Sequence, residues 1–213
     1  MRIRKRAGSA LLVGAAVATV IGLGTATALA TSATLTVRVT KGGPYTAKSS
    51  KTVLTDNGVS VTCSSSKTSG SVPTKTYRRA KVPVSVGTAA RLSFSGCTGP
   101  LGKVTVKVNK LPYHVTVTSK TNAKGQTDGL ITGANTSVSM TGCSFKVTGS
   151  APGFYSNGSH KLTLTPKLPN RPLASGRLTI SGVSGCAGLV SNGDHPAYKS
   201  IYTLSRAFVI KAS

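Results

Sequence analysis

The chain has 213 residues, with 27 Lys and Arg against 3 Asp and Glu, a formal net charge of +24 and no Trp. Three carboxylates leave almost no material for hydrolases built on paired acids, or for calcium and phosphoryl-transfer sites. No Cys or His pair has the close spacing of a zinc finger. Composition therefore favours a protein that is not an enzyme and needs no metal or cofactor.

The first thirty residues are typical of a secretory signal peptide. Four basic residues in the range 2–6 precede an apolar run, Ala10–Leu23, and residues 28–30 read Ala-Leu-Ala, the small-x-small form of a cleavage site. A retained anchor is the alternative, but the run lacks the ~20 strongly apolar residues of a membrane span. We therefore expect residues 1–30 to be removed. The chain 31–213 is then secreted, extracellular or cell-wall associated, with no membrane span after cleavage.

Cleavage leaves the chain strongly cationic. Four of the 27 basic residues go with residues 1–30, which leaves 23 Lys and Arg against three Asp and no Glu, a net charge of +20. The acids are Asp56, Asp128 and Asp194. Solubility does not need so large a charge. Outside a cell, a polycation meets wall phosphate polymers, acidic polysaccharide, lipid headgroups and released nucleic acid, and these are the expected partners.

Apolar and polar residues alternate with a period of two in the chain after residue 30. The alternation covers residues 33–40, 103–108, 113–117, 162–164 and 178–180, and no sustained helical period appears. Half-buried antiparallel strands have this pattern. Residues typical of turns separate the segments at 42–44, 56–58, 128–129, 157–158 and 192–193. The sequence predicts an all-β, antiparallel fold, either a sandwich or a closed barrel.

An internal two-fold repeat is the most specific pattern in the chain. Each half, about 31–122 and 123–213, holds a strand cysteine followed by a Ser-Gly-Cys-x-Gly corner. Gly142, inserted before the second strand cysteine, would act as a β-bulge that re-aims the next side chain. Two similar but unrelated corners are the alternative.

Four cysteines in an exported chain predict two disulfides, for which three connectivities exist. If the halves are equivalent, Cys63 pairs with Cys97 and Cys143 with Cys186. A catalytic thiol is the alternative, but no His is a close sequence neighbour of any cysteine.

The cysteine corners carry a resemblance. Residues 95–102 (SGCTGPLG), residues 183–189 (VSGCAGL) with Asn192-Gly193-Asp194, and residues 43–63 resemble segments of a group of small secreted actinobacterial β proteins of unknown function. The resemblance implies an exported β domain and brings no activity, cofactor or functional residue. This chain departs from the group in being richer in Lys and poorer in acids.

Catalytic motifs have little support. The chain has no Gly-x-Ser-x-Gly elbow and no His-Glu-x-x-His helix. Asp194-His195-Pro196 holds the one neighbouring acid–histidine pair. All three acids lie in sequences typical of turns, where Asp caps its own backbone, so a loop is favoured over a catalytic or metal site.

Three basic segments are candidates for binding anionic polymers. The densest contains Arg78, Arg79 and Lys81, and a second contains Lys103 and Lys107 on one face of an expected strand. The third is a Pro-rich segment, 166–177, with three cations. Solvated strand faces are the alternative for each. Few aromatics are present to stack on sugars or bases, so binding would be driven by phosphate charge and blind to sequence.

Two functions from different classes follow. The first is a non-enzymatic module that associates with anionic cell-envelope or extracellular polymers by charge. The second is a purely structural secreted domain that tolerates acid, because so few carboxylates titrate. A hydrolase is the weakest alternative.

Overall fold

The computed structural model describes residues 33–213, and within this range all regular secondary structure is β-strand. The predicted all-β class is confirmed, whereas the predicted signal peptide, residues 1–30, lies outside the described residues. Nothing in 33–213 forms a helix with the length and apolarity to cross a membrane. The strands are β1 (Thr34–Thr40), β2 (Gly43–Ser49), β3 (Thr52–Asp56), β4 (Val59–Val72), β5 (Lys75–Lys81), β6 (Val84–Gly99), β7 (Gly102–Val108), β8 (Tyr113–Val117), β9 (Gln126–Met140), β10 (Cys143–Ser156), β11 (Lys161–Leu164), β12 (Leu178–Ser184), β13 (Ala197–Leu204) and β14 (Val209–Ala212).

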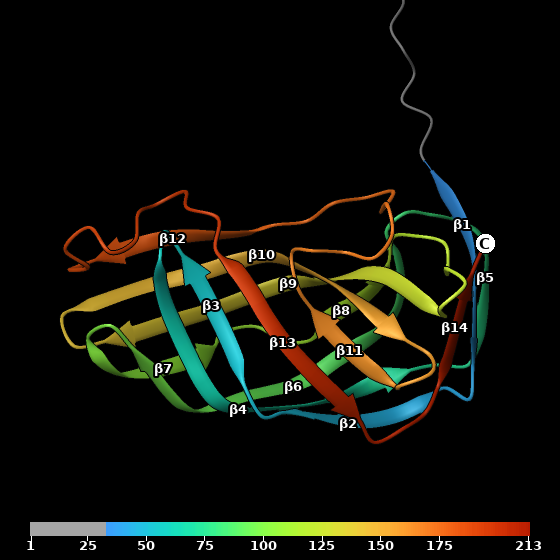
Figure 1. The fold of residues 1–213 in the computed structure, drawn as a ribbon, viewed down its shortest axis with the longest axis horizontal. Helices are drawn as coiled ribbons and strands as arrows, with labels where there is room; N and C mark the ends of the chain where they lie inside the picture. Colours follow the sequence, from blue (N-terminus) through green and yellow to red (C-terminus); the bar gives the residue numbers. More distant parts are fainter. Residues whose placement is uncertain (1–32) are drawn as a thin grey trace, which may run out of the picture. The chain divides into compact units, whose positions relative to one another are not determined.

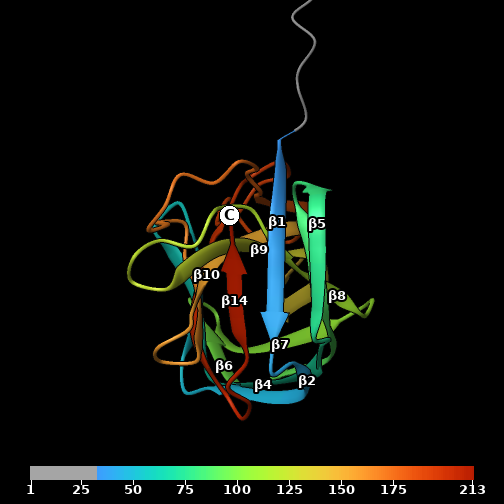
Figure 2. The same ribbon diagram turned by 90° about the vertical axis from the view of Figure 1, so that its right-hand side faces the viewer.

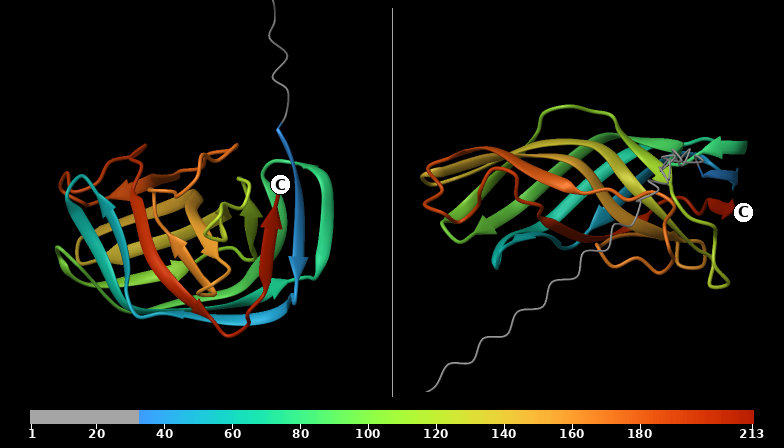
Figure 3. Two further views of the ribbon diagram at one scale, coloured as in Figure 1. Left: turned by 45° about the vertical axis from the view of Figure 1, so that its right-hand side comes forward. Right: turned by 90° about the horizontal axis from the view of Figure 1, so that it is seen from above.

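The larger sheet closes on itself. Its antiparallel pairings run from β10 through β11, β13, β2, β4, β6, β8 and β9 and back to β10, which makes a ring of eight strands. We call this the ring. Figure 1 shows its strands crossing the molecule obliquely, and Figure 3 shows the same strands from two further directions. Of the two predicted architectures, the closed barrel is the one observed.

The ring is closed at one end only. At the other end β7, β12 and β3 replace β8, β11 and β2 as partners of the long strands, and β12 does not pair with β13. We call the gap between β12 and β13 the seam. The loop after β12 covers it, because Ile180 N donates to Asp194 O (2.9 Å) and Gly193 N donates to Ile180 O (2.9 Å). Both disulfides belong to the apolar cluster at this end of the ring.

A three-stranded sheet, β14-β1-β5, forms a second layer, which we call the cap sheet. Leu35, Val37 and Val39 of β1 are buried in one apolar cluster with Val84 of β6 and Phe208. Figure 2 shows the cap sheet in front of one end of the larger sheet. The alternation predicted for residues 33–40 is confirmed over β1, since Leu35, Val37 and Val39 are buried and the even positions are not.

Two predicted turns are wrong. The turn predicted at 42–44 is absent, because Gly43 and Pro44 begin β2 and the chain bends before them, at Lys41. Asp128 and Gly129 lie inside β9, where Gly129 pairs with Val117 on one side and Gly153 on the other. The glycine is needed there because a Cβ would collide with the carbonyl oxygen of Thr116. An Asp-Gly pair can therefore mark a place where two backbones approach closely as well as a turn.

The bulge predicted at Gly142 is also absent. Thr141 and Gly142 form the turn between β9 and β10, and Met140 pairs directly with Cys143 across it. Gly142 has φ +69°, which glycine adopts at little cost. The turns expected at Asn57-Gly58, Asn157-Gly158 and Asn192-Gly193 are confirmed.

Both predicted disulfides are present. Cys63–Cys97 joins directly opposed residues of β4 and β6, whereas Cys143–Cys186 joins the first residue of β10 to the loop after β12. The two therefore sit differently in the sheet, and the internal repeat is not confirmed. Residues 33–213 belong to one compact unit, because the proposed halves pair in three places: β7 and β8 with β9, β2 and β3 with β13, and β1 with β14.

Removing Cys143–Cys186 should lower the free energy of unfolding by roughly 4 kcal/mol, because the bond closes a loop with a sequence separation of 43. Chemical denaturation of Cys143→Ala/Cys186→Ala against the wild type measures the difference. Non-reducing peptide mapping checks the pairing itself, and a peptide that joins residues 33–122 to residues 123–213 would contradict it.

Candidate functional site

The outer face of the cap sheet carries a group of cations and no acid. Five exposed basic side chains share this face, which we call the basic face: Arg38, Arg78, Arg79, Lys81 and Lys211. Arg38 lies directly opposite Lys211 on β14 and opposite Thr76 on β5. Like charges placed opposite each other in antiparallel strands repel. An anion bound over this face would relieve that repulsion.

A local irregularity turns two successive arginines outward. The register between β1 and β5 shifts between Leu35 and Val37, and Arg79 has φ +44°, a conformation that side-chain-bearing residues seldom adopt. Arg79 N donates to Thr36 Oγ1 (3.4 Å) at this point. A regular strand would alternate, so one of Arg78 and Arg79 would face inward. The bulge keeps both exposed while Tyr77 and Ala80 pack on the core.

The predicted binding residues do not form one surface. Lys103 and Lys107 are exposed on β7, as their parity predicted, but β7 lies at the far end of the molecule from β5 (Figure 1). The basic side chains near Lys103 and Lys107 are spread over neighbouring strands and form no dense group. Lys107 lies opposite Ser137 of β9, and Lys146 of β10 lies opposite the same serine on its other side. We call Lys103, Lys107 and Lys146 the β7–β10 lysines.

The Pro-rich segment 166–177 is held against the barrel by Asn170, a residue that the sequence analysis did not identify. Asn170 Nδ2 donates to Ser119 Oγ (3.2 Å), to Gln126 O (3.2 Å) and to Asp128 Oδ1 (3.3 Å). Its Oδ1 accepts a hydrogen bond from Asn122 Nδ2 (2.9 Å). Asn170 thereby fastens the segment to the residues around the start of β9. The three cations of the segment, Lys167, Arg171 and Arg177, are exposed beside it.

Asp128 is buried, contrary to the expectation that all three acids lie in turns. Its side chain is 0% exposed. Oδ1 accepts the bond from Asn170, but Oδ2 has no hydrogen-bond partner. Burial raises the pKa of Asp128 above its usual value, and the hydrogen bonds from Asn170 oppose that rise. The ionised form of Asp128 is therefore disfavoured in the folded chain.

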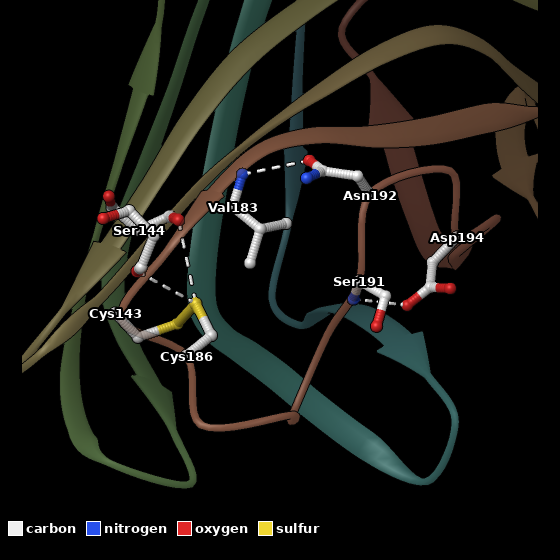
Figure 4. The surroundings of a disulfide bond; sticks show 8 residues. Cys143, Ser144, Val183, Cys186, Ser191, Asn192 and Asp194 are labelled. Carbon is white, nitrogen blue, oxygen red and sulfur yellow. Dashed lines mark hydrogen bonds between the residues drawn. A yellow bond between two sulfur atoms is a disulfide. The ribbon is translucent and has the colours of Figure 1, made fainter.

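Asp56 and Asp194 lie together at the seam of the ring. Burial raises the pKa of Asp56, the neighbouring carboxyl of Asp194 raises it further, and His195 opposes the rise. Asp194 itself caps a loop, since Ser191 N donates to its Oδ2 (2.7 Å), as Figure 4 shows beside the Cys143–Cys186 disulfide. His195 Nδ1 lies 3.0 Å from Leu178 O and 3.4 Å from Thr179 Oγ1.

This arrangement agrees with the loop interpretation of Asp194-His195-Pro196. Within 33–213, no three His, Cys, Asp or Glu residues come together in a group that could hold a metal ion.

Comparison with known proteins finds no matching family, no matching curated protein and no matching solved structure. The resemblance to secreted actinobacterial β proteins stays a prediction. These comparisons therefore assign no function to the chain.

The free energy of unfolding should rise as the pH falls from neutral toward about 4. A carboxyl whose pKa is raised in the folded state takes up its proton at a higher pH when folded than when unfolded, where its pKa is about 3.9. The gain begins as the pH falls through the folded pKa of Asp128 and is complete below the unfolded pKa. Urea denaturation across this range, at moderate salt, measures it.

Asp128→Asn isolates the contribution of that residue. The variant has no carboxyl to titrate at 128, so its stability curve should be flatter than that of the wild type over the same range. Parallel curves for the two proteins would show that Asp128 is not responsible.

Proposed function

We propose that the chain 31–213 is a secreted, non-enzymatic protein that associates by charge with anionic polymers of the cell envelope or the extracellular space. The partners are wall phosphate polymers, acidic polysaccharide and, without specificity, nucleic acid. The observation that carries the proposal is the basic face, where Arg38 and Lys211 are directly opposed and no acid is present on the cap sheet.

The arrangement of the basic face supports contact with an extended chain rather than with a small anion. Its five cations are exposed and spread over three adjacent strands. Neighbouring strands lie about 4.8 Å apart, so the face spans about 10 Å across the strands. A polymer with regularly spaced negative charges can meet several such cations at once, and each contact releases condensed counterions.

The β7–β10 lysines provide a second, weaker contact with the polymer. Lys107 and Lys146 flank Ser137 across three strands, and Lys103 lies four residues before Lys107 on β7. Because this group is distant from the basic face, one long polymer could touch both only by running along the molecule. The proposal therefore assigns the main contact to Arg78, Arg79 and Lys81 with Arg38 and Lys211, and a subsidiary one to Lys103 and Lys107.

A purely structural domain adapted to acid is the second candidate. The raised pKa values of Asp56 and Asp128 favour it, since acid would neutralise carboxylates whose ionised forms are disfavoured in the folded chain. This candidate requires no polymer binding. Salt dependence separates the two.

Binding to duplex DNA, used as a polyanion probe, should weaken with salt with a slope of log K against log[salt] of roughly −4.5, for five contacts. Arg78→Gln/Arg79→Gln/Lys81→Gln should reduce the slope to roughly −2, because three contacts are lost. Fluorescence anisotropy over a salt series measures both. Dextran sulfate and polyphosphate should compete, since no base or sugar is read.

Lys51→Gln/Lys67→Gln/Lys199→Gln is the matched control, because it removes the same charge from exposed positions outside the cap sheet. It should keep a slope close to that of the wild type. Equal loss in the two triple variants would mean that net charge alone drives binding, and no binding at low salt would leave the structural domain as the better account.

A further inference from the structure

The interior of the ring is hollow. A cavity of about 140 Å³ lies inside it, and each of the eight ring strands contributes a side chain to its wall. Barrels of about eight strands have an interior that side chains just fill or that holds one small ligand. Here small side chains keep part of it open, with Ala47, Ala89, Ala134 and Ala151 on the wall. We call this cavity the lumen.

An empty space of this size is unusual in a folded protein. Interiors are close-packed, and voids larger than a water molecule are few. The lumen lies between the two apolar clusters of the molecule, since its wall includes Val72 and Phe208 of one and Val61 and Val147 of the other. Water gains little there, because a buried water needs two to four polar partners. The lumen therefore suits an apolar occupant.

No charged side chain contributes to the wall of the lumen. Five of the six tyrosines do, and burial raises the pKa of Tyr45 and of Tyr155 to about 12, and that of Tyr198 well above its usual value. Most of their hydroxyls bond to the backbone, as Tyr155 Oη does with Phe208 O (2.8 Å). An ion would lose its hydration in the lumen without a counter-charge.

Hydroxyl groups gather at one part of the wall. Ser66 Oγ donates to Tyr202 Oη (2.6 Å), and Tyr202 Oη lies 3.1 Å from Tyr198 Oη. Both tyrosines line the lumen, whereas Ser66 and Ser200 do not. A hydroxyl can donate one hydrogen bond and accept two, so the paired hydroxyls of Tyr198 and Tyr202 can meet one ligand oxygen in the lumen.

We propose that the lumen binds one small, uncharged molecule, about the size of a substituted benzene ring, that is apolar except for one hydroxyl or carbonyl oxygen placed against the paired hydroxyls of Tyr198 and Tyr202. The size follows from the volume, because an engineered apolar cavity of about 150 Å³ binds benzene. This site is separate from the basic face and does not depend on charge.

Calorimetric titration at about 0.5 M NaCl, where charges are screened beyond roughly 4 Å, tests the site without interference from the basic face. The probes are toluene, 4-methylphenol and 4-methylbenzoate, which share a ring and a methyl group. Toluene and 4-methylphenol should bind, and 4-methylbenzoate should bind at least tenfold more weakly than 4-methylphenol, because its charge would be desolvated. Failure of both neutral probes, or equal binding of the charged one, would overturn the proposal.

Ala89→Leu and Ala90→Leu form a matched pair on β6. Ala89 is 7% exposed and lines the lumen, whereas its neighbour Ala90 is exposed. Ala89→Leu should weaken both neutral probes at least tenfold by filling the space, and Ala90→Leu should bind as the wild type does. Ala47→Val fills the lumen less and replaces Ala89→Leu if that variant does not fold. Unchanged affinity in a folded filling variant would place the probes elsewhere.

Tyr198→Phe tests the polar end of the site, because it removes one of the two paired hydroxyls on the wall and keeps the ring. It should weaken 4-methylphenol roughly three- to tenfold, the usual worth of a neutral hydrogen bond, and leave toluene unchanged. A parallel change for both probes would show that Tyr198 shapes the lumen but does not bind the ligand oxygen.

Discussion

The eight-stranded ring closes by hydrogen bonds at one end only, and much of the molecule follows from that. At the closed end the pairs β10–β11, β13–β2 and β6–β8 complete the ring, and the cap sheet packs over it. At the seam end β12 and β13 do not pair, and the loop after β12 fills the gap. Cys143–Cys186 fastens this loop to the start of β10, so a covalent bond supports the part of the barrel that the hydrogen-bond ladder leaves incomplete. Cys63–Cys97, at the same end, joins β4 and β6, which are already paired.

The same closure separates two chemistries. Strand parity sends side chains alternately into the ring and out of it, so an apolar, uncharged interior and a cationic exterior come from the same strands. Asp128 of β9 is buried but does not line the lumen, and Asn170 of the segment 166–177 donates to its Oδ1. The basic face and the lumen are therefore independent features, and screening by salt acts on the first alone.

Local patterns in the sequence predicted what depends on local rules. Alternation identified the strands around Val37 and Val104, and the even cysteine count with the repeated corners selected both disulfides. Asp128-Gly129 misled because a glycine required by the approach of Thr116 resembles a turn glycine. The lumen was not predicted at all, since Ala47, Ala89 and Ala151 meet only after the ring closes between residues far apart in the chain. Tyr198 and Tyr202, four residues apart on β13, were the one signal that could have indicated its polar wall.

Strand β5 has a consequence for assembly. It pairs with β1 on one side only, so its other edge presents unpaired backbone groups. Charged side chains and bulges on an edge strand discourage a second sheet from adding to it, and Arg78, Arg79 and Lys81 with the irregularity at Arg79 do both here. Covering those charges with a polyanion would take away part of this protection. The free edge of β5 would then be less protected against pairing with another strand.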